Sequence, residues 1–307
     1  MDHTTEAPVH LVDTAKSDPD AIDLEEIEAL LDDDWEERRN TGLKVLVGLA
    51  ADDPERVVPF VDDVIDCLSE SYGPARSHAA LVLTLLVEDY PELVEPAIPQ
   101  LVDNLTDETP IYRYRAARTI ALQTEATPES FVEHADDLID VLIDGPTVSK
   151  PAPPDDPSRR EQHKGQVEHL QPDFARSAAT KEVAANVLVE VAEREPSVCA
   201  ERLSDLYSVL ENEDEVPLVR GAIVDIVKHI AMADAADSPA VTDVLIDHLD
   251  DDTTVVRARA IRALGFAEVA DAIEPLRTVA ESDPDEDVRD LASETADWLE
   301  TAADRTD

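Results

Sequence analysis

The chain of 307 residues repeats itself about every 37 residues. The repeat is clearest in a series of basic residues that each open an apolar helical segment. These residues are Arg39, Arg76, Arg113, Lys181, Arg220, Arg257 and Arg289, and the steps between them are 37, 37, 68, 39, 37 and 32 residues. An acid stands six residues before each of them, except at Ala175. Such a period predicts an array of equivalent structural units.

Each unit is expected to contain two helices. After the basic residue, which we number position 0, apolar residues recur at positions +3, +4, +7, +8 and +11, the spacing of one helix face. Small residues at +3 and +4 would let neighbouring helices approach closely. A proline at +15 marks the start of the next unit's first helix, because proline is tolerated in a first helical turn. These prolines are Pro54, Pro91, Pro128 and Pro196.

The pattern predicts an all-α fold, because no segment shows the glycine-bounded alternation of strands. A two-helix unit cannot bury its apolar stripe alone, so we expect an α-α superhelix of about seven two-helix repeats, with the second helices on its concave face. The first helices are expected near 22–32, 55–69, 92–106, 129–143, 196–211, 239–250 and 270–281. The second helices are expected near 36–51, 75–89, 111–125, 177–194, 217–233, 255–267 and 286–301.

The domain organisation follows from where this pattern holds. Residues 1–20 are expected to be a disordered N-terminal tail, residues 21–303 a single solenoid and residues 304–307 a C-terminal tail. The acid at Asp107 recurs 37 residues later as Asp144, which leaves about 31 inserted residues before Lys181. The inserted segment, 145–175, is rich in proline and is expected to be a loop.

The stretch TTVVRARAIRALGFAEVADAIEPLRTVAESDPDEDVRDLASETADWL carries V-R, spaced alanines, A-L-G, A-I-x-P-L, D-P and a second V-R. The periodicity resembles HEAT repeats, and this last third also resembles the HEAT-like repeats of phycobilisome lyases. The resemblance implies a HEAT/ARM-type solenoid in which turn acids and arginines form an inter-repeat hydrogen-bond ladder. Its implied pairs are Asp33/Arg39, Glu70/Arg76, Asp107/Arg113, Asp214/Arg220, Asp251/Arg257 and Asp283/Arg289. The insertion splits the corresponding pair of the fourth unit, Asp144 and Lys181.

The charge limits the partners. With 72 acidic and 25 basic residues the net charge is −47, which disfavours nucleic-acid phosphates and anionic membrane surfaces. The acids are spread from end to end and lysine is scarce, as in proteins of salt-loving archaea. At molar salt the Debye length falls to about 3 Å, so the self-repulsion is screened. A halophilic archaeal source therefore explains the charge better than an acidic patch for a basic partner.

The sequence offers little chemistry. It holds no phosphate-binding glycine loop, zinc-protease motif, C-x-x-C or nucleophile elbow. His163 and His169 lack a third local metal ligand, and Cys67 and Cys199 fall in apolar-periodic segments. We expect no catalytic, cofactor or metal site. The N-terminus has no basic start followed by an apolar run, and no membrane-spanning stretch occurs, so a cytoplasmic location is expected.

The candidate partner-binding residues are basic and lie outside the core positions of the second helices. They occupy positions +2 and +5, beside Tyr114, and two more lie in the insertion, whose net charge is only −1. Arginine and tyrosine are frequent binding hot spots. Neutralisation of these cations by neighbouring acids is the alternative, as is a mobile surface loop for 145–175. The candidates are Lys44, Tyr114, Arg115, Arg118, Arg259, Arg262, Arg159 and Arg160.

The leading hypothesis is a non-enzymatic scaffold or adaptor that binds another protein or peptide through its concave groove and the 145–175 loop. One alternative is a lyase-type or other enzyme accessory protein. Another is a nucleic-acid-associated protein, which needs a contiguous basic groove that joins Lys44, Arg115, Arg118, Arg259 and Arg262. Stacking of the exposed solenoid ends would allow self-association, unless Trp298 in the last helix caps the stack.

Overall fold

The computed structural model describes residues 8–146, 160–212, 214–233 and 238–306. It describes the side chains of these ranges except at 160–163, 166, 238–239 and 304–306. All regular structure within the described ranges is helical, and they contain no strand. The predicted all-α class is therefore confirmed.

Broken first helices alternate with continuous second helices. Prolines interrupt the first helices because each removes a backbone donor, as Pro59 does inside η2. The first helices are α2 (Leu24–Leu31), η2 (Pro54–Phe60) with α4 (Val61–Asp66) and η3 (Cys67–Ser69), α6 (Pro91–Val94) with η4 (Glu95–Ala97), α7 (Ile98–Asp103) and η5 (Asn104–Thr106), η6 (Pro128–His134) with α9 (Ala135–Asp144), α11 (Pro196–Ala200) with α12 (Leu203–Leu210), α14 (Ser238–Asp247) with η8 (His248–Asp250), and η9 (Ala270–Ala272) with α16 (Ile273–Ser282). The second helices are α3 (Glu36–Ala50), α5 (Gly73–Leu86), α8 (Pro110–Ala126), α10 (Arg160–Arg194), α13 (Pro217–Met232), α15 (Thr254–Phe266) and α17 (Glu286–Thr306).

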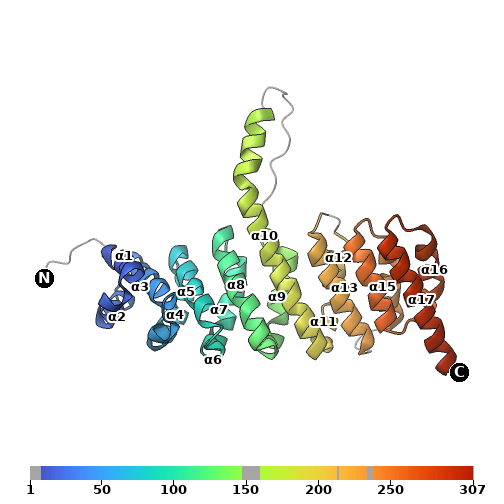
Figure 1. Cartoon of the computed structure of the whole chain (residues 1–307), viewed down its shortest axis with the longest axis horizontal. Coiled ribbons are helices and arrows are strands. Elements are labelled where there is room, and N and C mark those ends of the chain that lie inside the picture. Colours follow the sequence, from blue (N-terminus) through green and yellow to red (C-terminus); the bar gives the residue numbers. More distant parts are fainter. Residues whose placement is uncertain (1–7, 147–159, 213, 234–237, 307) are drawn as a thin grey trace. The chain divides into compact units, whose positions relative to one another are not determined.

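These pairs confirm the predicted solenoid of about seven two-helix repeats. The chain forms two compact units, unit 1 with Met1–Phe131 and Gly145–Val183, and unit 2 with Val132–Asp144 and Ala184–Asp307. Within unit 1 the helices α3, α5 and α8 lie side by side, and within unit 2 so do α13, α15 and α17 (Figure 1). The single solenoid over 21–303 stays a prediction.

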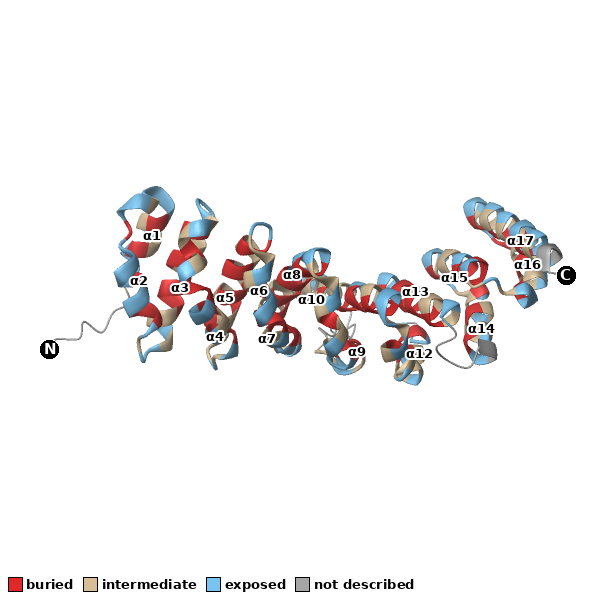
Figure 2. Ribbon diagram, turned by 90° about the horizontal axis from the view of Figure 1, so that it is seen from below, coloured by how far each residue is buried: buried red, intermediate tan, exposed pale blue. Residues whose placement is uncertain are grey.

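The core of each unit lies where helices face one another, and the outer surfaces are exposed (Figure 2). Small residues at positions +3 and +4, such as Ala79 and Ala80, are buried and allow adjacent second helices to pack closely. Leu43 and Leu46 are fully buried at +4 and +7 of the first repeat. Burial of one such leucine contributes about 1.5–3 kcal/mol, so repetition of this stripe supplies most of the favourable energy of the stack.

The prediction of disordered tails is wrong for most of their residues. Helix α1 (His10–Ser17) and the short η1 (Pro19–Ala21) occupy the end of the predicted N-terminal tail. Ala15 is fully buried against Gly48 of α3, where an added Cβ would come within 2.9 Å of the Ala15 methyl. The absence of a side chain at Gly48 therefore allows α1 to pack closely against α3. At the other end α17 continues to Thr306, while residues 1–7 and 307 lie outside the described part.

The predicted 145–175 loop is also wrong in part. Helix α10 begins at Arg160 and runs to Arg194, although the sequence predicts a start near 177. Pro172 lies inside this helix, where it removes a single hydrogen bond without ending the helix. The N-terminal part of α10 extends past the neighbouring α8 (Figure 1). Residues 147–159 of the insertion lie outside the described residues.

A turn ladder of acids and arginines links the helix pairs. We use this name for the acid six residues before position 0, the arginine at position 0, and the acid of the following turn. Within a repeat, the arginine donates a hydrogen bond to the backbone carbonyl of its own turn acid. These bonds are Arg39–Asp33 at 2.6 Å, Arg76–Glu70 at 2.6 Å, Arg113–Asp107 at 2.7 Å, Arg257–Asp251 at 2.8 Å and Arg289–Asp283 at 2.7 Å.

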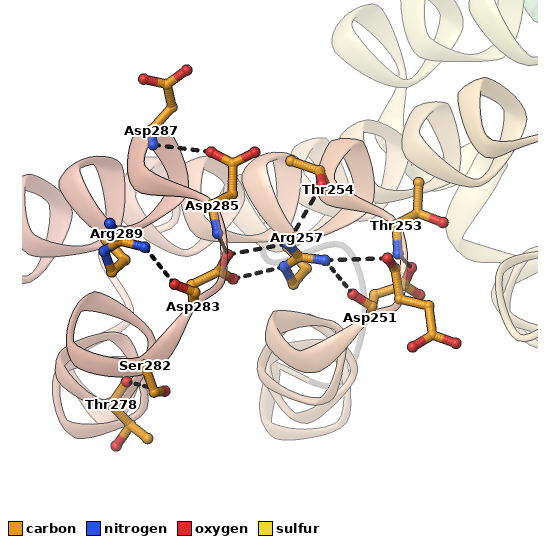
Figure 3. Close-up of polar contacts among 11 residues, drawn as sticks. Asp251, Thr253, Thr254, Arg257, Thr278, Ser282, Asp283, Asp285, Asp287 and Arg289 are labelled. Carbon is orange, nitrogen blue, oxygen red and sulfur yellow. Dashed lines mark hydrogen bonds and ion pairs between the residues drawn. The ribbon is translucent and has the colours of Figure 1, made fainter.

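The same guanidinium groups also reach the carboxylate of the next turn. Arg39 donates to Glu70 at 2.5 Å, and Arg257 donates to Asp283 at 2.7 and 3.1 Å (Figure 3). Arg76 binds Asp107 and Arg220 binds Asp251 in the same way. The aspartates also accept a backbone donor in the turn that leads into the following helix, since Asp283 accepts the Asp285 backbone N–H at 2.8 Å. Each turn therefore fixes the position of the next one.

The ladder varies at two positions: Arg220 lacks its implied pair, and Arg113 keeps its pair but binds a hydroxyl in the following repeat. Arg220 donates to the Leu210 carbonyl at 2.7 Å, not to Asp214. The cause is a longer turn, because residues 211–216 separate α12 from α13 whereas only 107–109 separate η5 from α8. The buried Arg113, after which the insertion follows, donates to the Ser177 hydroxyl at 2.7 Å in place of a carboxylate.

The Arg257–Asp283 pair is a deeply buried link of the ladder, with side chains only 8% and 4% exposed. Substitution of Arg257 by methionine leaves the Asp283 carboxylate buried without its counter-ion. We expect R257M to lose about 3–5 kcal/mol of unfolding free energy, measured by urea denaturation followed by circular dichroism.

Arg277 provides the matched control, because it is also bound to two acids, Asp297 and Glu300, but at the surface. R277M is expected to lose far less stability, since solvent screens exposed ion pairs. Equal losses in the two variants would show that the buried ladder has no special role.

The same pair predicts a pH dependence. Burial alone would raise the pKa of Asp283, but hydrogen bonds from Arg257 and the Asp285 N–H, with the charges of Arg257 and Arg289, outweigh it and hold the pKa below its ordinary 3.8. A depressed carboxyl pKa stabilises the fold above the unfolded-state pKa, and this contribution is lost as pH falls through the folded-state value. The stability difference between the wild type and D283N should be constant above about pH 5 and shrink below about pH 4. A difference that is unchanged down to the lowest pH would contradict this linkage.

Candidate partner-binding surfaces

The candidate basic residues on the second helices fall into two groups. Those at position +2 lean back onto the preceding second helix. Arg115 of α8 donates to the Ser77 hydroxyl of α5 at 2.7 Å, and Arg259 of α15 donates to Asp225 of α13 at 2.6 Å. Gly221 makes room for Arg259, because an added Cβ would lie 3.0 Å from the Arg259 Cδ atom. The arginines at position +2 therefore link neighbouring second helices within each unit.

The residues at position +5 are not used in this way. Arg118 and Arg262 are both exposed, and Lys44 is half-buried. Among the arginines whose side chains the structure describes, Arg118 and Arg262 alone make no hydrogen bond or ion pair within the chain. In a protein of net charge −47, two such arginines at the same repeat position are a conspicuous exception.

The surroundings of Arg115 in unit 1 are basic. Burial lowers the pKa of the neighbouring His78 to about 4, and the charges of Arg115 and Lys44 lower it further. His78 is thus neutral at pH 7. Its Nδ1 atom lies within hydrogen-bond distance, 2.8 Å, of the side-chain oxygen of Asn40. Burial also lowers the pKa of Arg115, with a contribution from the nearby charge of Arg176. The successive helices α3, α5, α8 and α10 therefore contribute a local cluster of nitrogen-bearing side chains, which are Lys44, His78, Arg115 and Arg176.

The remaining candidates contribute less to a site. Tyr114 is half-buried, and the ring of its neighbour Tyr112 fills the space over Gly73, where an added Cβ would lie 2.4 Å from it. Arg159 lies outside the described residues, and so does the side chain of Arg160. The described part of the insertion is helical, so any partner contact there would be made by the surface of α10.

Sequence reasoning missed an aromatic pocket in unit 2. It has a volume of about 360 Å³ and lies between α15 and α17. Phe266 and Trp298 line it and are 62% and 46% exposed, with Arg262 and Glu294 beside them. The Lys228 ammonium stands 5.6 Å from the centre of the Phe266 ring. Both aromatic residues occupy position +9, outside the core positions, and this shared register is the sequence pattern that could have revealed the pocket.

Metal-type clusters and reactive thiols are absent from the residues that the structure describes. These residues contain no group of three or more histidine, cysteine or acidic side chains that could hold a metal ion. Burial raises the pKa of Cys67 and of Cys199 to about 12, so both thiols are protonated and inert at neutral pH. Within the described residues, no helix has the length and apolar character required to span a bilayer.

Comparison with known proteins supports the repeat assignment. A family model described as HEAT repeats matches residues 242–305, which span most of the last two helix pairs. No curated protein sequence matches the chain. The family match supports HEAT repeats in this part of unit 2, and the other helix pairs have the same two-helix arrangement.

Solved structures show a similar fold. The crystal structure of an engineered protein is 16% identical, with a TM-score of 0.53, and the alignment covers 78% of this chain and 96% of that one. A second engineered protein is 18% identical over 80% of this chain and 98% of that one, with a TM-score of 0.47. Kap121p is 15% identical with a TM-score of 0.44, and the match covers 91% of this chain but only 34% of Kap121p.

Proposed function

We propose that this chain is a non-enzymatic HEAT-repeat scaffold that holds a protein partner against the exposed faces of its second helices. A stack of helix pairs offers an extended side-chain surface without a deep reaction cleft. Such a surface suits peptides and helices better than small-molecule chemistry.

The observation that carries this proposal is the unpaired state of Arg118 and Arg262. Every other described arginine binds a carboxylate, a carbonyl or a hydroxyl within the chain, so acids and carbonyls compete strongly for these side chains. An exposed guanidinium has five donors and matches a carboxylate in a bidentate way. Two arginines that stay unpaired at position +5 are therefore available to acidic groups of a partner.

The two alternative functions have less support. A nucleic-acid surface needs five basic residues in one groove, but Arg115 and Arg259 are engaged with Ser77 and Asp225. An enzyme-accessory role of the phycobilisome-lyase type is supported only by the sequence pattern of the last repeats. The predicted contact through the 145–175 insertion adds to the scaffold proposal without carrying it.

The test is the double charge reversal R118E/R262E. The wild type and the variant are used to capture proteins from a lysate of the source organism in its own salt, with quantitative mass spectrometry. A hydrogen bond to a charged group contributes about 1.5–3 kcal/mol, so loss of two should reduce recovery of a specific partner at least tenfold.

The variant K16E/R194E is the control, because it changes the net charge equally at exposed sites away from position +5. It should recover the same partner as the wild type. Equal recovery by R118E/R262E would contradict the proposed role of these arginines.

We also propose a cytoplasmic location and a halophilic source, and the halophilic source rests on the uniform acidity of the sequence. The self-repulsion of 47 net charges opposes compaction and is screened by salt. The thermal unfolding midpoint should rise steeply as KCl increases from about 0.1 M to about 3 M, where the Debye length falls below roughly 3 Å. Sucrose at equal osmolality should raise it much less, and an equal rise would attribute the effect to solute exclusion.

A further inference from the structure

Both unpaired arginines stand one helical turn before an exposed apolar residue. Leu122 follows Arg118 on α8, and Phe266 follows Arg262 on α15; both apolar residues occupy position +9 and are 37% and 62% exposed. Residues four apart lie on the same helix face. The same combination of a free guanidinium and an exposed apolar side chain therefore occurs once in each compact unit.

In unit 2 this combination opens onto the aromatic pocket. Gly265, Leu291 and Thr295 complete its wall beside Phe266 and Trp298. On α17, Glu294 at +5 and Trp298 at +9 repeat the spacing of the charged and aromatic residues on α15. One end of the pocket is thus aromatic and the other end is charged. Two of the chain's six phenylalanine and tryptophan residues, Phe266 and Trp298, lie at this exposed position +9.

We propose that this pocket receives a bulky apolar side chain from an amphipathic helix of a partner protein, and that Arg262 binds an aspartate or glutamate one turn away on the same helix. The Arg118–Leu122 pair is a second subsite of the same kind. This inference rests on the proposed scaffold function and specifies the chemistry of the partner.

The occupant is helical because the pocket wall consists of side chains. The two helices that form it use their backbone donors and acceptors internally, so they offer none to an extended segment, which would have to leave its own backbone groups to water. A helix satisfies these groups itself and presents apolar and acidic side chains at intervals of three or four residues.

Net charge disfavours two other occupants more strongly than a short helix that carries one acidic side chain beside its apolar residue. A second copy of this chain would bring a further 47 negative charges, and an anionic membrane surface would be repelled. Lys228 places a cation over the Phe266 ring at the aromatic end, and Arg262 lies with Glu294 at the charged end of the pocket. Of these two cations, Lys228 is paired with Asp225, whereas Arg262 is free to bind a partner's carboxylate.

The experiment selects helical peptides from a displayed library on the full chain. Enriched peptides should carry Leu, Ile, Met or Phe three or four residues from Asp or Glu. Their affinity should fall at least tenfold in F266A, in W298A and in R262Q, all of which change exposed side chains that folding does not require. In a W35F background Trp298 is the sole tryptophan, and its fluorescence should shift to shorter wavelength when the peptide covers it.

Trp35→Ala is the matched control, because Trp35 is 48% exposed in unit 1, close to the 46% of Trp298. It should bind the selected peptides as the wild type does. Enrichment of basic peptides would overturn the proposal. Wild-type affinity for the selected peptides in both F266A and W298A would also overturn it. So would vesicle binding (phosphatidylcholine with phosphatidylglycerol) or self-association in sedimentation velocity, if either is lost in the same variants.

The outcomes also separate this inference from the scaffold proposal. Loss of native capture in R118E/R262E, with no peptide selected at the pocket, contradicts the inference alone. Peptides that depend on the pocket, with native capture unchanged in R118E/R262E, contradict the proposed role of the free arginines in the scaffold.

Discussion

The stack depends on a directional interaction that crosses from one turn to the next. Apolar burial provides most of the favourable energy, but it has no direction and does not by itself set the register of one repeat on another. The turn ladder does so, because one guanidinium binds the carbonyl of its own turn and the carboxylate of the following turn. Asp283 shows the full arrangement, since it accepts from Arg257, accepts the Asp285 backbone N–H in the turn before α17 and offers its carbonyl to Arg289. Aspartate suits this position because its short side chain can bond to the turn backbone and to an arginine at once.

The ladder also explains why unpaired arginines carry information. A chain with 72 acids and 25 basic residues offers carboxylates to every exposed cation. At the surface, Arg202 illustrates this by pairing with Asp136, Asp140 and Asp205. Arg118 and Arg262 escape such pairing although they lie on equivalent faces of α8 and α15. Their availability is a property of those faces, where position +5 projects away from the preceding helix while position +2 leans onto it.

The parts of the fold that could be predicted are those set by the repeat itself. Helix bounds followed from the apolar spacing, because each repeat packs only on its neighbours and repeats the same local rule. The exceptions depend on single residues whose effect lies elsewhere in the chain. Gly48 makes the seat for α1, and the six-residue turn before α13 removes Asp214 from the ladder. For the candidate site, nothing in the sequence near Arg115 or Arg259 indicated that Ser77 and Asp225 would bind them.

Position along the second helix therefore separates structural from binding roles more sharply than residue type does. Arginine at position 0 binds within the ladder, at +2 it is bound to the preceding second helix, and at +5 it is unpaired. The apolar residues obey the same rule, since those at +3, +4 and +7 are buried whereas Leu122, Phe266 and Trp298 at +9 are exposed. Because +5 and +9 lie one turn apart, the exposed face of α8 and that of α15 each pair a charge with an apolar group. We expect a surface of that composition to suit an amphipathic partner.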